Sequence, residues 1–111
     1  MTTTAHTAEA GAAHNPAASA SVALDIGAGH GALILYPDER YRGREIELSR
    51  LDGDGHRVHT GVHDRGTLAG SMLTAIFGSL PAGDYVVWED AVTAGATVAV
   101  PDGGVAELRL P

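Results

Sequence analysis

Apolar and polar residues alternate with a period of two along most of the chain after residue 20. Val22, Leu24 and Ile26 are separated by small or polar residues, and Ile46 and Leu48 are separated by a glutamate. This period is that of a β-strand with one buried face. The pattern predicts strands over residues 21–26, 32–36, 44–50, 56–65, 72–77, 85–88, 96–100 and 105–110.

Turn residues separate the predicted strands at intervals of about ten residues, as in the Asp-Gly-Asp-Gly run of residues 52–55. Short strands at this spacing are typical of a sandwich or barrel. We therefore expect an all-β fold, a single antiparallel β-sandwich of seven or eight strands with Greek-key connections. The predicted core consists of Val22, Leu24, Ile26, Leu33, Leu35, Ile46, Leu48, Val58, Val62, Phe77, Tyr85, Val87, Val98, Val100, Leu108 and Leu110.

The glycine cluster of residues 27–31 allows two interpretations. The run from Asp25 to Gly31, Asp-Ile-Gly-Ala-Gly-His-Gly, resembles the first motif of class I methyltransferases, in which a long helix follows the glycines. Here Pro37 stops any helix after about one and a half turns. We therefore interpret the cluster as the turn of a hairpin that joins strands 21–26 and 32–36.

Composition narrows the class of protein. Residues 1–20 are rich in alanine and threonine, so we expect a disordered tail there and the sandwich domain over residues 21–111. The tail lacks the basic start and apolar centre of a signal peptide, which indicates a cytoplasmic protein. The formal net charge of −7 argues against nucleic acid or anionic membranes as partners. Because cysteine is absent, thiolate metal sites and disulfides are excluded.

Histidines are the strongest candidates for chemistry. His59 and His63 share a face of one predicted strand but lie about 13 Å apart at about 3.3 Å per residue, too far to bind one ion together unless the strand bends or ends between them. A zinc, copper or nickel site would therefore combine one of them with His30, Glu45 or Glu47. The structural alternative is that these histidines are solvated and pair with the glutamates across two strands.

Aromatic residues suggest an interaction surface. Trp88, the single tryptophan, is predicted on the strand face opposite Tyr85 and Val87. With Tyr36 and Tyr41 it could form an aromatic patch, and a second copy could bind there or along an edge strand. The alternative is that Trp88 merely covers an open edge of the sandwich.

Hydrolytic chemistry has weaker support. Ser71 and Ser79 lack the Gly-x-Ser-x-Gly setting of a serine nucleophile. Residues 52–55 resemble part of a calcium loop, but the distal glutamate is missing. We therefore expect a non-catalytic interaction or accessory module, with divalent-metal binding as the alternative and a small hydrolase as the third possibility.

Two family resemblances rest on short motifs. The C-terminal half, with Leu-Pro-Ala-Gly-Asp-Tyr at residues 80–85 and the closing segment 98–105, is similar to transthyretin-like and Cna-B-like β-sandwiches. Residues 22–110 also resemble a group of small, uncharacterised actinobacterial proteins, through segments 25–27, 31–33, 43–47 and 59–62. Some members of that group are labelled phospholipases, but the residues of this chain offer no chemical support for that label.

Overall fold

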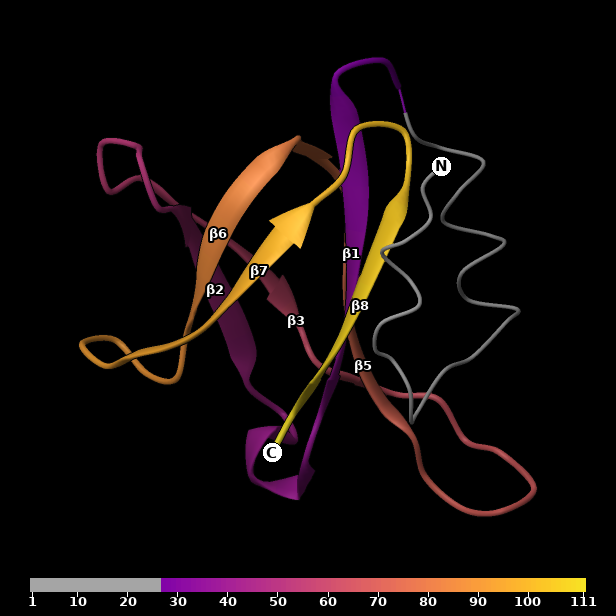
Figure 1. The fold of residues 1–111 in the computed structure, drawn as a ribbon. Helices are drawn as coiled ribbons and strands as arrows, with labels where there is room; N and C mark the ends of the chain where they lie inside the picture. The colour runs from indigo at the N-terminus through magenta and orange to yellow at the C-terminus, as the bar shows by residue number, and fades with distance from the viewer. Residues whose placement is uncertain (1–26) are drawn as a thin grey trace.

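The computed structural model describes residues 27–111, which form two four-stranded sheets packed as a sandwich (Figure 1). The strand orders are β4-β5-β1-β8 and β3-β2-β6-β7. The predicted all-β sandwich is confirmed. In chain order the elements are β1 (His30–Pro37), the 3-10 helix η1 (Glu39–Tyr41), β2 (Glu45–Arg50), β3 (Arg57–Gly61), β4 (His63–Asp64), β5 (Leu73–Pro81), β6 (Gly83–Trp88), β7 (Ala94–Val100) and β8 (Val105–Leu110).

The chain changes sheet after β1, β3, β5 and β7. The three strand pairs between these crossings, β2–β3, β4–β5 and β6–β7, are antiparallel neighbours. The last strand, β8, returns beside β1 and pairs with it in parallel, from Ala32 opposite Val105 to Pro37 opposite Leu110. This parallel pair is a difference from the fully antiparallel sandwich that the strand spacing predicted.

The predicted first hairpin is only partly within the described residues. Residues 21–26, the core positions Val22, Leu24 and Ile26, and the tail over residues 1–20 lie outside them. Strand β1 pairs with β5 on one edge and with β8 on the other. Its neighbours are therefore supplied by the distant C-terminal half of the chain and not by a local hairpin.

The glycine cluster leads directly into β1 and not into a helix. Gly29 has a φ of +76°, a conformation that other residues rarely adopt. A Cβ atom on Gly31 would overlap the carbonyl oxygen of Pro101, so glycine lets β1 approach the β7–β8 connection closely. The cluster thus serves backbone packing at this end of the sheet. No helix of the described residues is long and apolar enough to cross a membrane.

The sandwich core lies between the sheets, and most of the predicted core residues are in it. The described members that are buried are Leu33, Leu35, Ile46, Leu48, Phe77, Tyr85, Val87, Val100 and Leu110, and Val58, Val62, Val98 and Leu108 pack against them half-buried. The prediction missed four buried members of this core, Tyr41, Ala75, Leu80 and Ala106, and it also missed the buried Leu73. A second buried apolar cluster, made by Ala32, Ile34 and Tyr36, lies on the opposite face of β1 from Leu33 and Leu35.

Candidate functional site

The outer face of the β3-β2-β6-β7 sheet carries the predicted histidine and glutamate residues of β2 and β3. Glu47 lies opposite His59 in the strand register, and Glu45 lies opposite Gly61. The nearest charged contact of the His59 ring is diagonal, with its Nδ1 3.3 Å from Oε1 of Glu45. The side chains of both residues are about 60% exposed (60% and 64%), so water screens this contact.

The five predicted metal ligands do not gather in one place. His63 belongs to β4, which pairs with β5 in the other sheet, because the predicted fourth strand breaks at Val62. The backbone N–H of Val62 donates to the carbonyl of Arg44 at 3.0 Å where the chain crosses between sheets. His30 begins β1, with its Nδ1 3.0 Å from the carbonyl oxygen of Ala28. Within residues 27–111, no three His, Cys, Asp or Glu side chains are grouped to hold a metal ion.

Glu47, the remaining predicted ligand, is already engaged by an arginine. Nη1 of Arg57 donates to Oε1 of Glu47 at 2.8 Å and to the carbonyl of Ala91 at 3.0 Å. The guanidinium carbon of Arg57 lies 3.7 Å from the centre of the Trp88 ring, a close cation–π contact. The indole N–H of Trp88 donates to Ser49 Oγ at 3.0 Å. These contacts tie three strands, β2, β3 and β6, together on the outer face.

The predicted aromatic patch does not form. Trp88 is on the outer face, as predicted, whereas Tyr41 is 2% exposed and belongs to the core. The reason is that Asp38 caps η1 by accepting from the N–H of Arg40, and this turn swings Tyr41 inward. Tyr36 is 6% exposed on β1, and its hydroxyl donates to Glu107 at 2.7 Å. The prediction that Tyr36 and Tyr41 offer an exposed aromatic surface beside Trp88 is therefore wrong.

A shallow hollow of about 190 Å³ lies beside Trp88, lined by Arg44, Glu45, Glu47, Trp88, Asp90 and Ala91. Its polar groups are largely satisfied within the protein. Arg44 Nη2 donates to the carbonyl of Glu89 at 2.9 Å. The backbone N–H of Val92 donates to Asp90, and this bond is the main cause that holds the pKa of Asp90 below its ordinary value. The hollow is therefore a polar surface whose described residues are largely paired within the protein.

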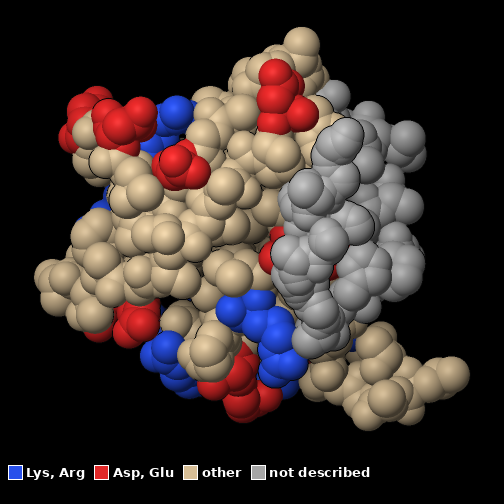
Figure 2. Space-filling model, viewed as in Figure 1, with Lys and Arg blue, Asp and Glu red and all other residues tan. Residues whose placement is uncertain are grey.

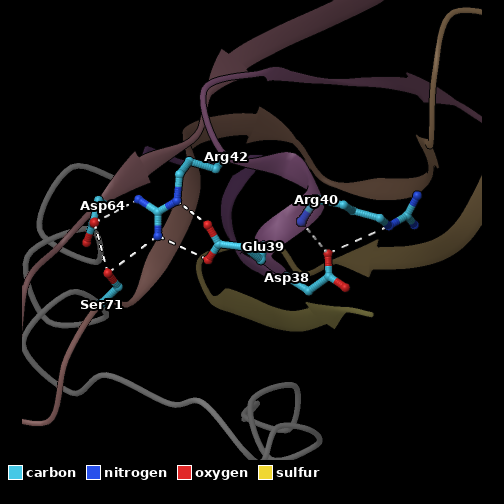
Figure 3. Close-up of polar contacts among 6 residues, drawn as sticks. All are labelled: Asp38, Glu39, Arg40, Arg42, Asp64 and Ser71. Atoms are coloured by element: carbon cyan, nitrogen blue, oxygen red, sulfur yellow. Dashed lines mark hydrogen bonds and ion pairs between the residues drawn. The ribbon is translucent and has the colours of Figure 1, made fainter.

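Arg42 is the centre of a charged cluster, which Figure 3 shows between η1 and β4. It contacts the carboxylate of Glu39, donates from Nη1 to Asp64 at 2.9 Å, and lies 3.4 Å from the hydroxyl of Ser71. These hydrogen bonds are the largest cause of the lowered pKa of both Glu39 and Asp64, and they raise the pKa of Arg42.

This cluster has the chemistry of a structural clamp. The Ser71 hydroxyl donates to Oδ2 of Asp64 at 3.0 Å, but the same carboxylate is already paired with Arg42. A carboxylate with a lowered pKa is a weak base, so it does not activate the serine for attack. The cluster links η1 to β4 and to the connection between β4 and β5.

The four edge strands differ sharply in how they are protected. β4 has only two residues, β8 carries Glu107 and Arg109, and β3 carries Arg57 and His59. The seven residues of β7, Ala-Gly-Ala-Thr-Val-Ala-Val, include no charged side chain and no proline. Figure 2 shows this uncharged surface in tan, with acidic and basic side chains around its margin. Long uncharged edges are the ones that natural proteins usually avoid exposing.

The backbone of β7 presents hydrogen-bonding groups outward. The carbonyl of Asp84 on β6 accepts from Leu51, so Asp84 faces β2, and its neighbour Tyr85 must face β7. Tyr85 lies opposite Val98, which therefore faces β6. The alternation leaves the N–H and C=O groups of Thr97 and Ala99 on the free edge. Among residues 27–111, the backbone of β7 has no hydrogen-bonding strand other than β6.

Sequence reasoning proposed self-association along some edge strand but did not identify which one. The signal was present as a run of seven uncharged residues, yet an edge is a property of the strand order, which no local pattern shows. No family model, curated protein or solved structure matches the chain. The resemblances to transthyretin-like sandwiches and to small actinobacterial proteins remain predictions.

Proposed function

We propose that this protein is a non-catalytic interaction module that works by strand addition at the free edge of β7. The observation that carries the proposal is the absence of charge on this edge, which is seven residues long and has exposed Ala94, Ala96, Thr97 and Ala99. Backbone groups on such an edge can pair with an extended strand from a partner, and the main-chain hydrogen bonds then provide much of the affinity.

The partner that we propose is a second copy of the chain. Two β7 strands can pair antiparallel about a two-fold axis, because the same surface then contacts itself. The small side chains on the outer face of β7 let the two copies approach without a steric clash. Each chain carries a net charge of −7, so the copies repel one another through the surrounding solvent. Self-association should therefore strengthen as added salt screens this repulsion.

Sedimentation of the full chain over a range of concentrations tests the proposal. We expect a monomer–dimer equilibrium that shifts toward the dimer at high salt. The Thr97→Lys variant should remain monomeric at concentrations where the wild type dimerises, because a lysine on an edge strand opposes pairing. The added positive charge reduces the net negative charge, so the loss of the dimer would not follow from stronger repulsion.

The matched control is His59→Lys, which adds the same side chain to β3, the opposite edge of the same sheet. This variant should dimerise as the wild type does. A wild-type protein that stays monomeric at every concentration and salt level would contradict self-pairing. Equal loss of the dimer in both variants would show that the contact is not specific to β7.

Divalent-metal binding remains the alternative function, and the contact between Glu45 and His59 is the observation that favours it. This pair supplies two ligands, whereas a structural zinc site has four and a catalytic one has three from the protein. Because Glu47 is paired with Arg57 and His63 lies in the other sheet, a third ligand would require one of these contacts to change.

A further inference from the structure

The sandwich has a side opening between β3 and the second half of β5. Strand β4 pairs with β5 only at Leu73 and Thr74, so within residues 27–111 the rest of β5 up to Pro81 has no strand neighbour on that edge. β3 is likewise the last strand of its sheet. Gly53, Asp54 and His56 of the β2–β3 connection lie at this opening.

A pocket of about 330 Å³ lies in this opening and reaches the core. Leu48 and Val58 line it from one sheet, Leu80 and Pro81 line it from the other, and Tyr85 is also part of its wall. Small-molecule sites are typically apolar clefts of about 300–1,000 Å³ with a few convergent polar groups. At about 30 Å³ for each water-sized group, this pocket holds roughly ten such groups.

Arg50 contributes hydrogen-bond donors to the wall of the pocket, and several contacts fix its guanidinium. Its Nη1 lies 3.3 Å from both the carbonyl oxygen of Ala82 and the hydroxyl of Tyr85, and its Nε lies 3.4 Å from Asp52. A Cβ atom on Gly83 would come within 2.6 Å of Nη2, so this glycine leaves the space that the guanidinium occupies.

One edge of this guanidinium still has donors to offer. Arginine has five N–H groups, and the contacts of Arg50 use those of Nε and Nη1. Within the described part of the chain, Nη2 of Arg50 has no hydrogen-bond acceptor. Because Arg50 is part of the pocket wall, a ligand oxygen that reaches Nη2 could accept from it without breaking any of the existing contacts.

The charges around the opening disfavour the binding of both anions and cations. Asp52 and Asp54 flank the single guanidinium of Arg50, so the local formal charge is negative and an anion gains little attraction. A cation would have to come close to Arg50 in the wall of the pocket. An uncharged oxygen acceptor meets neither difficulty.

We propose that this pocket binds an uncharged small molecule of about ten non-hydrogen atoms, with an apolar body and one hydrogen-bond-accepting oxygen. The apolar body lies against Leu48, Val58 and Leu80, and the oxygen accepts from Arg50. This site is separate from the β7 edge, because its residues come from β2, the β2–β3 connection, β3, the end of β5 and β6.

Three probes with chains of equal length test the proposal: 2-octanone, octanoate and octylammonium. Each is titrated into the full chain, and backbone amide shifts are followed by NMR. We expect 2-octanone to bind at least tenfold more tightly than either ion and to shift the amides of Val58, Leu80 and Tyr85. Equal affinity for all three probes, or shifts confined to other residues, would overturn the proposal.

Two variants separate the apolar and polar parts of the site. Val58→Trp fills the pocket, and Arg50→Met removes the donor; each should weaken 2-octanone binding about tenfold or more, as expected when a ligand loses its space or a hydrogen bond. The matched controls, Val86→Trp and Arg57→Met, change similar residues on the outer face and should bind 2-octanone as the wild type does. If Val58→Trp does not fold, Arg50→Met and the comparison of head groups still decide the outcome. Unchanged binding by folded Arg50→Met would contradict the proposed role of Arg50.

Discussion

The two edges of the β3-β2-β6-β7 sheet are built in opposite ways. On β3, Arg57 pairs with Glu47 and stacks on Trp88, and His59 contacts Glu45. On β7, no side chain of residues 94–100 makes a hydrogen bond or an ion pair within the described residues. The two strands share one sheet and one fold, so the difference lies in their side chains.

This difference shows how one sheet can have a closed edge and an open one. The charged residues of β3 are directed across the outer face toward β2 and β6, where they stabilise the sheet and also discourage pairing with another chain. In β7, Val98 and Val100 pack in or against the core, and the side chains at the exposed positions of the strand make no hydrogen bond or ion pair within residues 27–111. The open edge is therefore the better candidate for recognition.

Removing Trp88 should have the largest effect on the closed edge. We expect Trp88→Ala to lower the free energy of unfolding by about 3 kcal/mol, the lower end of the range for buried aromatic residues, because this ring is half-buried. The loss includes the stack with Arg57 and the hydrogen bond to Ser49. Denaturant unfolding measures this change.

The control for this prediction is Trp88→Phe, which keeps an aromatic ring beneath Arg57 but loses the indole N–H. It should cost about 1 kcal/mol, the typical contribution of one hydrogen bond. If Trp88→Ala were as stable as the wild type, the outer-face contacts of Trp88 would not support the β3 edge.

Removing Arg57 should have a smaller effect on stability. Arg57→Ala loses one cation–π contact and one partly exposed ion pair, so we expect a cost of about 1 kcal/mol. The β3 edge also loses a protecting charge, and the variant should self-associate more strongly than the wild type in sedimentation experiments. Arg109→Ala on β8 is the control, because Arg109 makes no charged contact within the described residues; its stability should change by less than about 0.5 kcal/mol.

Local sequence patterns predicted the strands and their buried faces well. The alternation placed Leu48 inside and Glu47 outside, and the Asp-Gly-Asp-Gly turn correctly joined two antiparallel strands. The predictions of strand pairing failed where the pairing depends on residues that are distant in the sequence. The chain leaves one sheet at Val62 although residues 57–64 keep a strand-like pattern, and β8 pairs with β1 across more than 70 residues of sequence.

The candidate sites were harder to predict for the same reason. The sequence predicted that Glu45 and Glu47 would lie near Arg57, His59 and His63 across two strands. Glu45 contacts His59 and Glu47 contacts Arg57, whereas His63 lies in the other sheet. The pattern did not indicate which of these partners would engage Glu47; Arg57 does so while its guanidinium stacks on Trp88. Tyr41 was predicted to join a surface patch with Trp88, whereas it ends the 3-10 helix and is buried in the core.

The smallest expected effect concerns β4, an edge of the other sheet. Arg42 lowers the pKa of Glu39 and Asp64 below their ordinary values of 4.5 and 3.8. A carboxyl group whose pKa is lower in the folded state contributes stability above its unfolded pKa and loses that contribution as the pH falls through its folded value. We therefore expect part of the acid-induced loss of stability to begin below about pH 4.5.

Arg42→Met tests whether Arg42 causes this pH dependence of stability, because the variant lacks the cation and keeps an apolar side chain of similar shape. Unfolding curves measured from neutral pH down to about pH 3 should show a smaller dependence of stability on pH in the variant than in the wild type. Arg109→Met is the matched control and should keep the wild-type slope. Identical slopes in all three proteins would mean that the Arg42 cluster does not stabilise the folded state, and that the short length of β4 protects this edge without help from its ion pairs.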